Sequence, residues 1–212
     1  KEGKDESNIY FVGNIMIDSL FNTLERVKNS AILEELNLEA GDFGVLTLHR
    51  PSNVDDLQTF LGILSALEEI GEIVPLVFPV HPRTANRIEE FALSERVDSI
   101  PNAILTEPVG YLDFIALVSQ CRIVITDSGG IQEETTALGI PCITLRENTE
   151  RPITVTEGTN RVVGTDARAI VSAVKEGLEK QDEEVSAPEY WDGRTAIRIV
   201  DIIQSEIGAG KR

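Results

Sequence analysis

The sequence predicts an α/β fold in which helices cover both faces of a parallel β-sheet. Short apolar runs rich in Val and Ile alternate along the chain with longer segments whose apolar residues recur at helical spacing. The 212 residues are 42% hydrophobic and 26% charged, a composition ordinary for a globular protein with a real core. Strands that alternate with helices are joined by right-handed crossovers. We therefore expect a Rossmann-like, doubly wound parallel sheet.

In the first half of the chain, three strands and three helices are expected in alternation. Apolar runs predict strands at 9–12, 43–48 and 73–80, and helical spacing predicts helices at 14–28, from about 56 to 67, and at 84–92. Ile17, Leu20 and Leu24 share one face of the first helix, and Asp55 or Asp56 is expected to cap the second.

In the second half, the same alternation continues to the end of the chain. Strands are expected at 103–105, 123–126 and 142–145, and helices at 111–119, after 129, at 166–178 with Asp166 as cap, and at 195–207. The polar, Pro-containing stretch 181–190 is the one plausible linker. We therefore expect a domain at 1–190 and, at 191–212, a final helix that packs on this domain or reaches to another one.

The charge of the chain restricts its partners. The formal net charge of -17 argues against nucleic acid and against an acidic membrane surface, because both require clustered Lys and Arg. A single anionic ligand stays compatible with this charge if helix N-termini and a few Arg residues hold it.

The two cysteines and the absence of long apolar runs indicate the compartment. Cys121 and Cys142 lie beside apolar runs without a metal-binding spacing, so we expect buried, reduced core residues and no metal. No apolar run reaches the length of a transmembrane helix, and the opening residues, a charged lead-in or a cut end, do not form a signal peptide. We expect a cytoplasmic protein.

The segment 123–134 is the most informative part of the chain. An apolar strand leads into Ser128, Gly129 and Gly130, and a helix begins there. Glycine lets the backbone approach a ligand without a Cβ in the way, and the helix directs free N–H groups and the positive end of its dipole at the turn. Phosphate fits such a turn, and an acid such as Glu134, one turn further on, can reach a ribose hydroxyl. Nucleotide binding is the leading hypothesis.

Other predicted strands are followed by polar loops as well, and ligands in this class bind beyond the carboxyl ends of strands. Both histidines, His49 and His81, directly follow a strand and have an Arg within two positions. His49 either contacts phosphate or sugar, or carries a proton, or is a strand-end residue bonded to backbone. His81 belongs to a ligand site or to a structural turn around Pro82. Arg151 is either a phosphate clamp or a surface residue.

Two further candidates have a structural alternative. Phe114 either stacks on a base or belongs to the core, and Glu134 is either a ribose ligand or a solvated helix acid.

Taken together, these motifs resemble the non-hydrolysing UDP-N-acetylglucosamine 2-epimerase family. The resemblance runs from about residue 9 to about residue 207 and rests on Gly13-Asn14…Asp18, His49-Arg50, Pro79-Val80-His81, Glu107-Pro108…Tyr111-Leu112…Phe114, the string at 126–134, and Thr149-Glu150-Arg151-Pro152. That family has the two-domain GT-B-type fold shared with one class of glycosyltransferases. The resemblance covers only its carboxyl-terminal half, so a second domain of similar size is the expected partner.

The resemblance implies a reaction without a metal or other cofactor. UDP-GlcNAc and UDP-ManNAc are interconverted by anti elimination of UDP and its re-addition with inversion at C2. The acids that move the C2 proton are carried mainly by the other half, so no general base is assigned here. The resemblance also implies a homodimer.

The same resemblance implies a role for each site residue. Ser128, with the N–H groups of Gly129 and Gly130, would hold the diphosphate; Arg151 would hold a phosphate, Glu134 the ribose, and the segment around Phe114 the uracil. His49 would lie at the sugar–diphosphate junction and aid catalysis, beside Arg50.

Regulation is the point on which the sequence departs from its family. Many bacterial members continue His-Arg with Arg-Glu-Asn, whereas this chain has Pro51-Ser52-Asn53. Bacterial members can bind a second UDP-GlcNAc as an activator, and they do so with residues near His49-Arg50 and His81.

Three alternatives stay open from the sequence. The chain is a donor-nucleotide half of a GT-B glycosyltransferase, a hydrolysing epimerase that releases ManNAc and UDP, or a non-catalytic interaction module.

Overall fold

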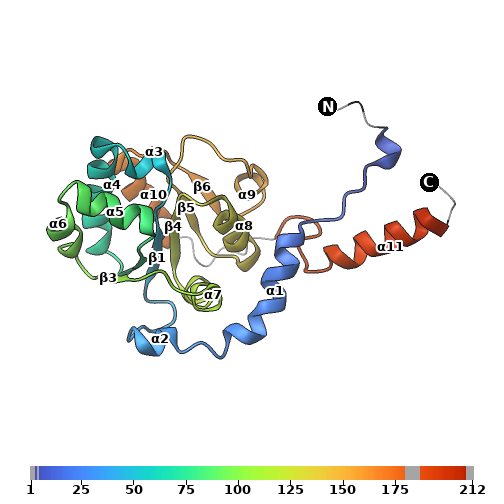
Figure 1. Cartoon of the computed structure of the whole chain (residues 1–212), viewed down its shortest axis with the longest axis horizontal. Coiled ribbons are helices and arrows are strands. Elements are labelled where there is room, and N and C mark those ends of the chain that lie inside the picture. The colour runs from blue at the N-terminus through green and yellow to red at the C-terminus, as the bar shows by residue number, and fades with distance from the viewer. Residues whose placement is uncertain (1–2, 4, 180–186, 209–212) are drawn as a thin grey trace.

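The computed structural model describes residues 3, 5–179 and 187–208. In that part of the chain, six strands form one all-parallel sheet in the order β3-β2-β1-β4-β5-β6 (Figure 1). The strands are β1 (Gly44–Thr47), β2 (Leu76–Pro79), β3 (Ala103–Thr106), β4 (Ile123–Thr126), β5 (Cys142–Thr144) and β6 (Asn160–Val162). The predicted doubly wound α/β fold is confirmed, and its strand order reverses between β1 and β4.

The helices occupy the connections between these strands. They are the 3-10 helix η1 (Glu6–Asn8) and the α-helices α1 (Ile15–Val27), α2 (Ile32–Glu35), α3 (Pro51–Val54), α4 (Leu57–Gly71), α5 (Pro82–Glu90), α6 (Ser94–Asp98), α7 (Tyr111–Gln120), α8 (Gly129–Leu138), α9 (Ile153–Thr156), α10 (Ala167–Glu179) and α11 (Thr195–Gly208). Asp56, not Asp55, caps α4, because its carboxylate accepts the Thr59 N–H at 2.8 Å. Asp166 caps α10 as predicted.

Each face of the sheet has its own apolar core. Successive strand residues point to opposite faces, so Leu46 of β1 and Leu48 just after it pack with α4 and α10, whereas Val45 packs with α1 and α7. Strand β4 divides its residues in the same way, with Ile123 and Ile125 on the first face. A sheet buried on both faces explains why its strands are continuous apolar runs in the sequence.

Strands β1 and β4 end side by side, which positions the two loops that follow them. Thr47 pairs with Thr126, and their hydroxyl oxygens lie 2.7 Å apart. His49 and Asp127 therefore leave the sheet at the same place, the topological switch point at which doubly wound sheets bind ligands.

The strand predicted at 9–12 is wrong. These residues pair with no strand among the described residues, and Ile9 and Phe11 are exposed. The segment instead follows α11, with the Tyr10 hydroxyl donating to Glu206 and the Phe11 ring centroid 5.3 Å from that of Tyr190. Its apolar pattern therefore marks an exposed surface, not a buried strand.

Six short elements were not predicted, namely η1, β6, α2, α3, α6 and α9. Each contains only three to five residues, too few for a periodic pattern. Of the predicted linker at 181–190, residues 181–186 lie outside the described residues.

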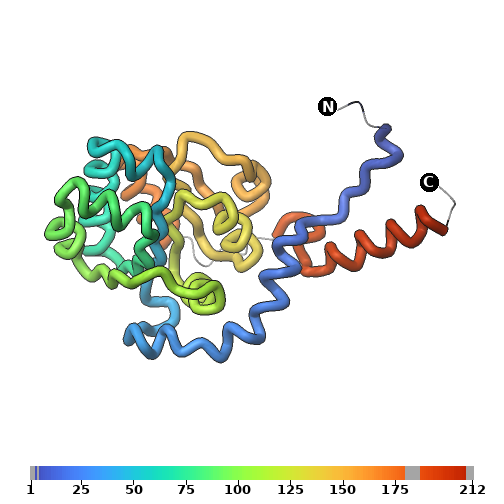
Figure 2. Tube along the Cα trace, viewed as in Figure 1, coloured from blue at the N-terminus to red at the C-terminus, as the bar shows by residue number. Residues whose placement is uncertain are grey.

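The first and last helices are tied together while α11 extends away from the sheet (Figure 2). Asp18 of α1 is buried, and its carboxylate accepts the N–H groups of Thr195 and Ala196 at 3.0 and 2.7 Å. Gly13, at φ 101°, lets the chain cross residues 190–195, because a Cβ there would overlap the Tyr190 carbonyl oxygen.

Candidate functional site

The N-terminus of α8 is open, as the glycine motif predicts. Ser128 is the N-cap residue, yet its side chain forms no capping hydrogen bond. A Cβ on Gly130 would meet no described atom within 4 Å, and one on Gly129 would meet only Glu150 Oε2, at 3.8 Å. Neither glycine has a positive φ among the described residues, so their absent side chains, not their backbone conformation, keep the helix N-terminus clear.

Asp127 organises the first histidine loop. This fully buried carboxylate accepts the backbone N–H groups of His49 and Arg50 at 3.0 and 2.8 Å and the Asn53 amide at 3.2 Å. It also lies 2.7 Å from His49 Nδ1, and Arg50 Nε donates to the Asp127 carbonyl at 2.9 Å. A carboxylate at this position makes Nδ1 the protonated nitrogen and leaves Nε2 for other partners. The His49 ring thus bonds to a side-chain carboxylate and, among the described residues, to no backbone group.

A cavity of about 300 Å³ brings four of the predicted site residues together. It is lined by His49, His81, Phe114 and Ser128 and otherwise by Thr47, Leu48, Pro79, Pro108, Val109 and Ile131. Its walls are mostly apolar, and its polar lining residues are Thr47, His49, His81 and Ser128. Phe114 also packs against the core on the α1 and α7 face, as its core interpretation has it, and its stacking on a base stays a prediction.

His81 has a structural role that His49 lacks. It is the N-cap residue of α5, and its Nδ1 accepts the Arg83 N–H at 3.1 Å. Arg83 turns away from the cavity and binds Asp55 at 2.8 Å. The ring centroids of the two histidines nevertheless lie 5.4 Å apart, so His81 serves a turn and faces the cavity at once.

The two adjacent acids of α8 are buried and point to different partners. Glu134 accepts the Tyr111 hydroxyl at 2.9 Å, and burial raises the pKa of Glu134, with the charge of Glu133 adding to the effect. Glu133 accepts Asn14 Nδ2 at 2.9 Å and binds Arg151 Nε at 3.1 Å. Glu134 is therefore no solvated helix acid.

The loop that carries Arg151 is fixed onto α8. The Thr149 hydroxyl donates to Gln132 Oε1 at 2.6 Å, and the Arg151 N–H donates to Thr149 Oγ1 at 3.0 Å. Arg151 keeps 44% of its side chain exposed although Glu133 holds its Nε. Its Nη1 also donates weakly to the Glu150 carbonyl, at 3.4 Å.

The comparison with known families decides the relationship. A family model described as UDP-N-acetylglucosamine 2-epimerase matches residues 1–204. The chain belongs to this family.

Individual members of the family align with nearly the whole chain. The UDP-N-acetylglucosamine 2-epimerase of Methanocaldococcus jannaschii is 37% identical over 214 residues, which cover 96% of this chain and 56% of the relative. A crystal structure of the M. jannaschii UDP-GlcNAc 2-epimerase with UDP-GlcNAc and UDP superposes with a TM-score of 0.81 at 36% identity, over 95% of this chain and 57% of that one. The chain thus spans just over half the length of these relatives, as the partial, carboxyl-terminal-half resemblance predicts.

Sequence identity within the family does not define the sugar. The UDP-2,3-diacetamido-2,3-dideoxy-D-glucuronate 2-epimerase of Pseudomonas aeruginosa is 35% identical over 199 residues, which cover 93% of this chain and 53% of the relative.

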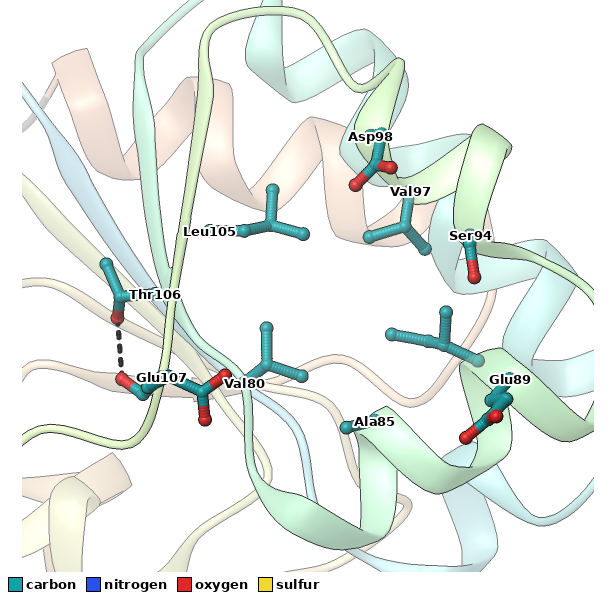
Figure 3. Close-up of a pocket in the computed structure, with 10 residues that line it drawn as sticks. Val80, Ala85, Glu89, Ser94, Val97, Asp98, Leu105, Thr106 and Glu107 are labelled. Carbon is teal, nitrogen blue, oxygen red and sulfur yellow. Dashed lines mark hydrogen bonds between the residues drawn. The ribbon is translucent and has the colours of Figure 1, made fainter.

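A second cavity of this epimerase-family chain is unsuited to a nucleotide. It measures about 530 Å³ and lies between the carboxyl ends of β2 and β3 and helices α5 and α6 (Figure 3). Val80, Val97 and Leu105 form apolar walls, whereas Glu89, Asp98 and Glu107 surround them with negative charge, which repels a diphosphate. No predicted site residue lines it.

The remaining polar clusters give no metal site in the described part of the chain. No group of three or more His, Cys, Asp or Glu side chains there could hold a metal ion. Cys121 and Cys142 are buried and free, as predicted, and burial raises the pKa of Cys121 to about 12 and that of Cys142 to about 11. Within the same described residues, no helix is both long and apolar enough to span a bilayer.

Proposed function

We propose that this chain is the UDP-binding half of an enzyme that interconverts UDP-GlcNAc and UDP-ManNAc. One observation carries the proposal: the unobstructed N-terminus of α8 opens beside the cavity of His49 and Phe114, at the switch point of the sheet. Free backbone N–H groups and the helix dipole favour an anion there, and the mostly apolar cavity can take a base. Family membership supports the same ligand.

Each part of UDP has matching groups around this opening. The Ser128 hydroxyl and the N–H groups of Gly129 and Gly130 bind the diphosphate, and Arg151 adds a guanidinium that Glu133 keeps in position. Glu134 accepts the ribose hydroxyls, for which Tyr111 orients its carboxylate. Uracil fits beside Phe114 in the apolar part of the cavity.

The reaction that these groups support is an elimination followed by an addition. A base removes the C2 proton while the bond from C1 to the UDP oxygen breaks, which gives 2-acetamidoglucal; UDP then adds back to C1 as a proton returns to the opposite face of C2. Negative charge builds up on the departing diphosphate, so donors fixed in advance at its position lower the barrier. His49, oriented by Asp127, meets the junction of sugar and diphosphate through Nε2.

The rest of the enzyme comes from a second domain. We assign 1–190 to the UDP-binding domain and 191–212 to a helix that contacts the amino-terminal domain. Helix α11 has four apolar residues that are spaced three or four positions apart and are all at least half exposed: Ile197, Val200, Ile203 and Ile207. This exposed apolar face supports a contact with another domain. The C2 base belongs to that domain, and the full enzyme is expected to be a homodimer.

Calorimetry on the chain itself tests the binding half of this proposal. UDP should bind weakly, and Gly129→Val should abolish binding, because the new side chain meets almost nothing in the protein and can only obstruct the ligand. Gly62→Val is the matched control, since its Cβ also enters open space and α4 packs against the opposite face of the sheet from α8. If Gly129→Val bound UDP as well as Gly62→Val does, the site would be refuted. Failure of the folded wild-type chain to bind UDP at millimolar concentration would refute it too.

Adding the amino-terminal domain tests the chemistry. With UDP-GlcNAc in D₂O, NMR should show inversion at C2 with deuterium uptake. Transfer of the sugar to an acceptor would indicate a glycosyltransferase instead, and release of free ManNAc would indicate a hydrolysing epimerase. Because a relative of similar identity carries the name of a diacetamido-glucuronate epimerase, UDP-2,3-diacetamido-2,3-dideoxy-D-glucuronate should be assayed in parallel.

A further inference from the structure

Glu150 places a carboxylate at the opening of α8. Its Oε2 lies 3.8 Å from the Cβ position of Gly129, the nearest described atom to that position. Its Oε1 accepts Arg146 Nη2 at 2.9 Å, and Arg50 Nη2 lies 3.9 Å from Oε2. The hydrogen bond and charge of Arg146, followed by the charges of Arg50 and Arg151, lower the pKa of Glu150. One side-chain anion thus lies among three arginines, beside the free N–H groups of the helix.

The two ends of the Arg146–Glu150 pair are exposed to water to very different degrees. Only 9% of the Arg146 side chain is exposed, against 61% of Glu150. Arg146 Nη1 is buried and has no hydrogen-bond partner among the described residues. A buried guanidinium needs an anion beside it at all times, whereas an exposed carboxylate loses little when it turns into solvent. We therefore expect the Arg146 guanidinium to keep its position, whereas another anion can replace the Glu150 carboxylate beside it.

We propose that Glu150 is a resident anion that the diphosphate displaces, and that Arg146 and Arg50 pass from its carboxylate to the phosphates. This inference rests on the proposed UDP site. It adds Arg146 to the phosphate-binding groups through Nη2, the nitrogen that Glu150 holds in the free protein. It also makes Glu150 a competitor of the ligand, so removing its charge should tighten UDP binding although a contact of the free protein is lost.

Glu150→Gln tests the exchange because it keeps the size of the side chain and removes only the charge. Since two like charges about 4 Å apart in water repel enough to change an equilibrium about fivefold, calorimetry should show UDP affinity rising about fivefold. Affinity for uridine, which lacks phosphate, should not change. Glu147→Gln is the control: it removes the same charge from the same loop, and among the described residues Glu147 forms no ion pair.

The outcomes separate this inference from the proposed function. If the wild type binds UDP and Glu150→Gln binds it equally or more weakly, the exchange is wrong and the UDP site stands. An equal gain in Glu147→Gln would mean that overall charge is responsible, which also overturns the exchange. If neither the wild type nor Glu150→Gln binds UDP, the site itself is lost and the exchange with it.

A measurement on the wild-type chain avoids any question of folding. The carboxyl ¹³C resonance of Glu150 should move toward that of a solvent-exposed glutamate when inorganic pyrophosphate is added. A resonance that stays in place at saturating pyrophosphate would contradict displacement.

Discussion

The two histidine loops begin alike in sequence and end differently in structure. Each follows a buried parallel strand, and each has an arginine within two positions. In the first loop, the buried Asp127 carboxylate holds both the backbone and the ring of His49. In the second, the His81 ring accepts a hydrogen bond from its own loop and caps α5.

Position in the sheet explains the difference. The loop after β1 lies at the reversal of strand order, next to the loop after β4 that supplies Asp127, whereas β2 lies one strand further out, between β1 and β3. A histidine at the switch point can be oriented by a neighbouring strand's loop and directed at a ligand. His81, one strand away, instead uses its Nδ1 to accept an N–H group of the helix that follows it.

Removing Asp127 should have the largest effect. Asp127→Ala leaves two backbone N–H groups without an acceptor and the Asn53 amide with the Leu145 carbonyl alone, so we expect the free energy of unfolding in urea to fall by about 3–5 kcal/mol. Asp166→Ala, which removes only the cap of α10, should lower it by about 1 kcal/mol. Equal losses in the two variants would show that Asp127 is an ordinary turn residue.

Binding of UDP should distinguish the loops next. His49→Ala should weaken UDP binding by about 1.5–3 kcal/mol, the range for a hydrogen bond to a charged group, and His81→Ala by no more than about 1.5 kcal/mol. Calorimetry of both variants provides the comparison. A larger loss in His81→Ala would reverse the assignment of the two rings.

The free energy of unfolding should depend on His81 in the way it depends on a helix N-cap residue. His81→Ala should lower the free energy of unfolding by about 1 kcal/mol, and His81→Asn should keep most of it, because Asn is a strong N-cap residue. Chemical denaturation measures both. If Asn did no better than Ala at this position, the ring would not be acting as a cap.

The smallest effect is a difference in proton position. In the neutral form, His49 should carry its proton on Nδ1, which donates to Asp127, and His81 on Nε2, since its Nδ1 accepts the Arg83 N–H. Long-range ¹H–¹⁵N NMR correlations of the two rings report the tautomers. The same tautomer in both rings would show that the two histidines do not differ in hydrogen bonding.

Sequence periodicity predicts most of the fold but only part of the candidate site. The strands at the centre of the sheet are buried on both faces, so their apolar runs are unmistakable. The run at 9–12 is equally apolar, but it lies exposed beside α11. Local sequence cannot reveal this difference, because it depends on contacts with residues far along the chain. The strand β6 has one buried and one exposed residue among three, so it has no pattern to detect.

The site residues that the sequence missed act through other residues. Asp127, Tyr111 and Glu133 each form contacts with partners at least 18 positions away. A hint existed for Asp127, because it directly follows a buried strand at the expected switch point. Tyr111 and Glu133 stood in the family motifs but received no role, since a helix-end tyrosine and a helix acid are ordinary on a surface.

The tie between Asp18 and the start of α11 sets an order of events during folding. The acceptor for the Thr195 and Ala196 N–H groups lies on α1, 177 positions before Thr195. Before α11 packs against α1, the Asp18 carboxylate lacks these two donors, and the first turn of α11 lacks its acceptor. We expect the final helix to form only once the sheet has brought both ends of the chain together, and pulsed hydrogen exchange at residues 195 and 196 would show protection there last.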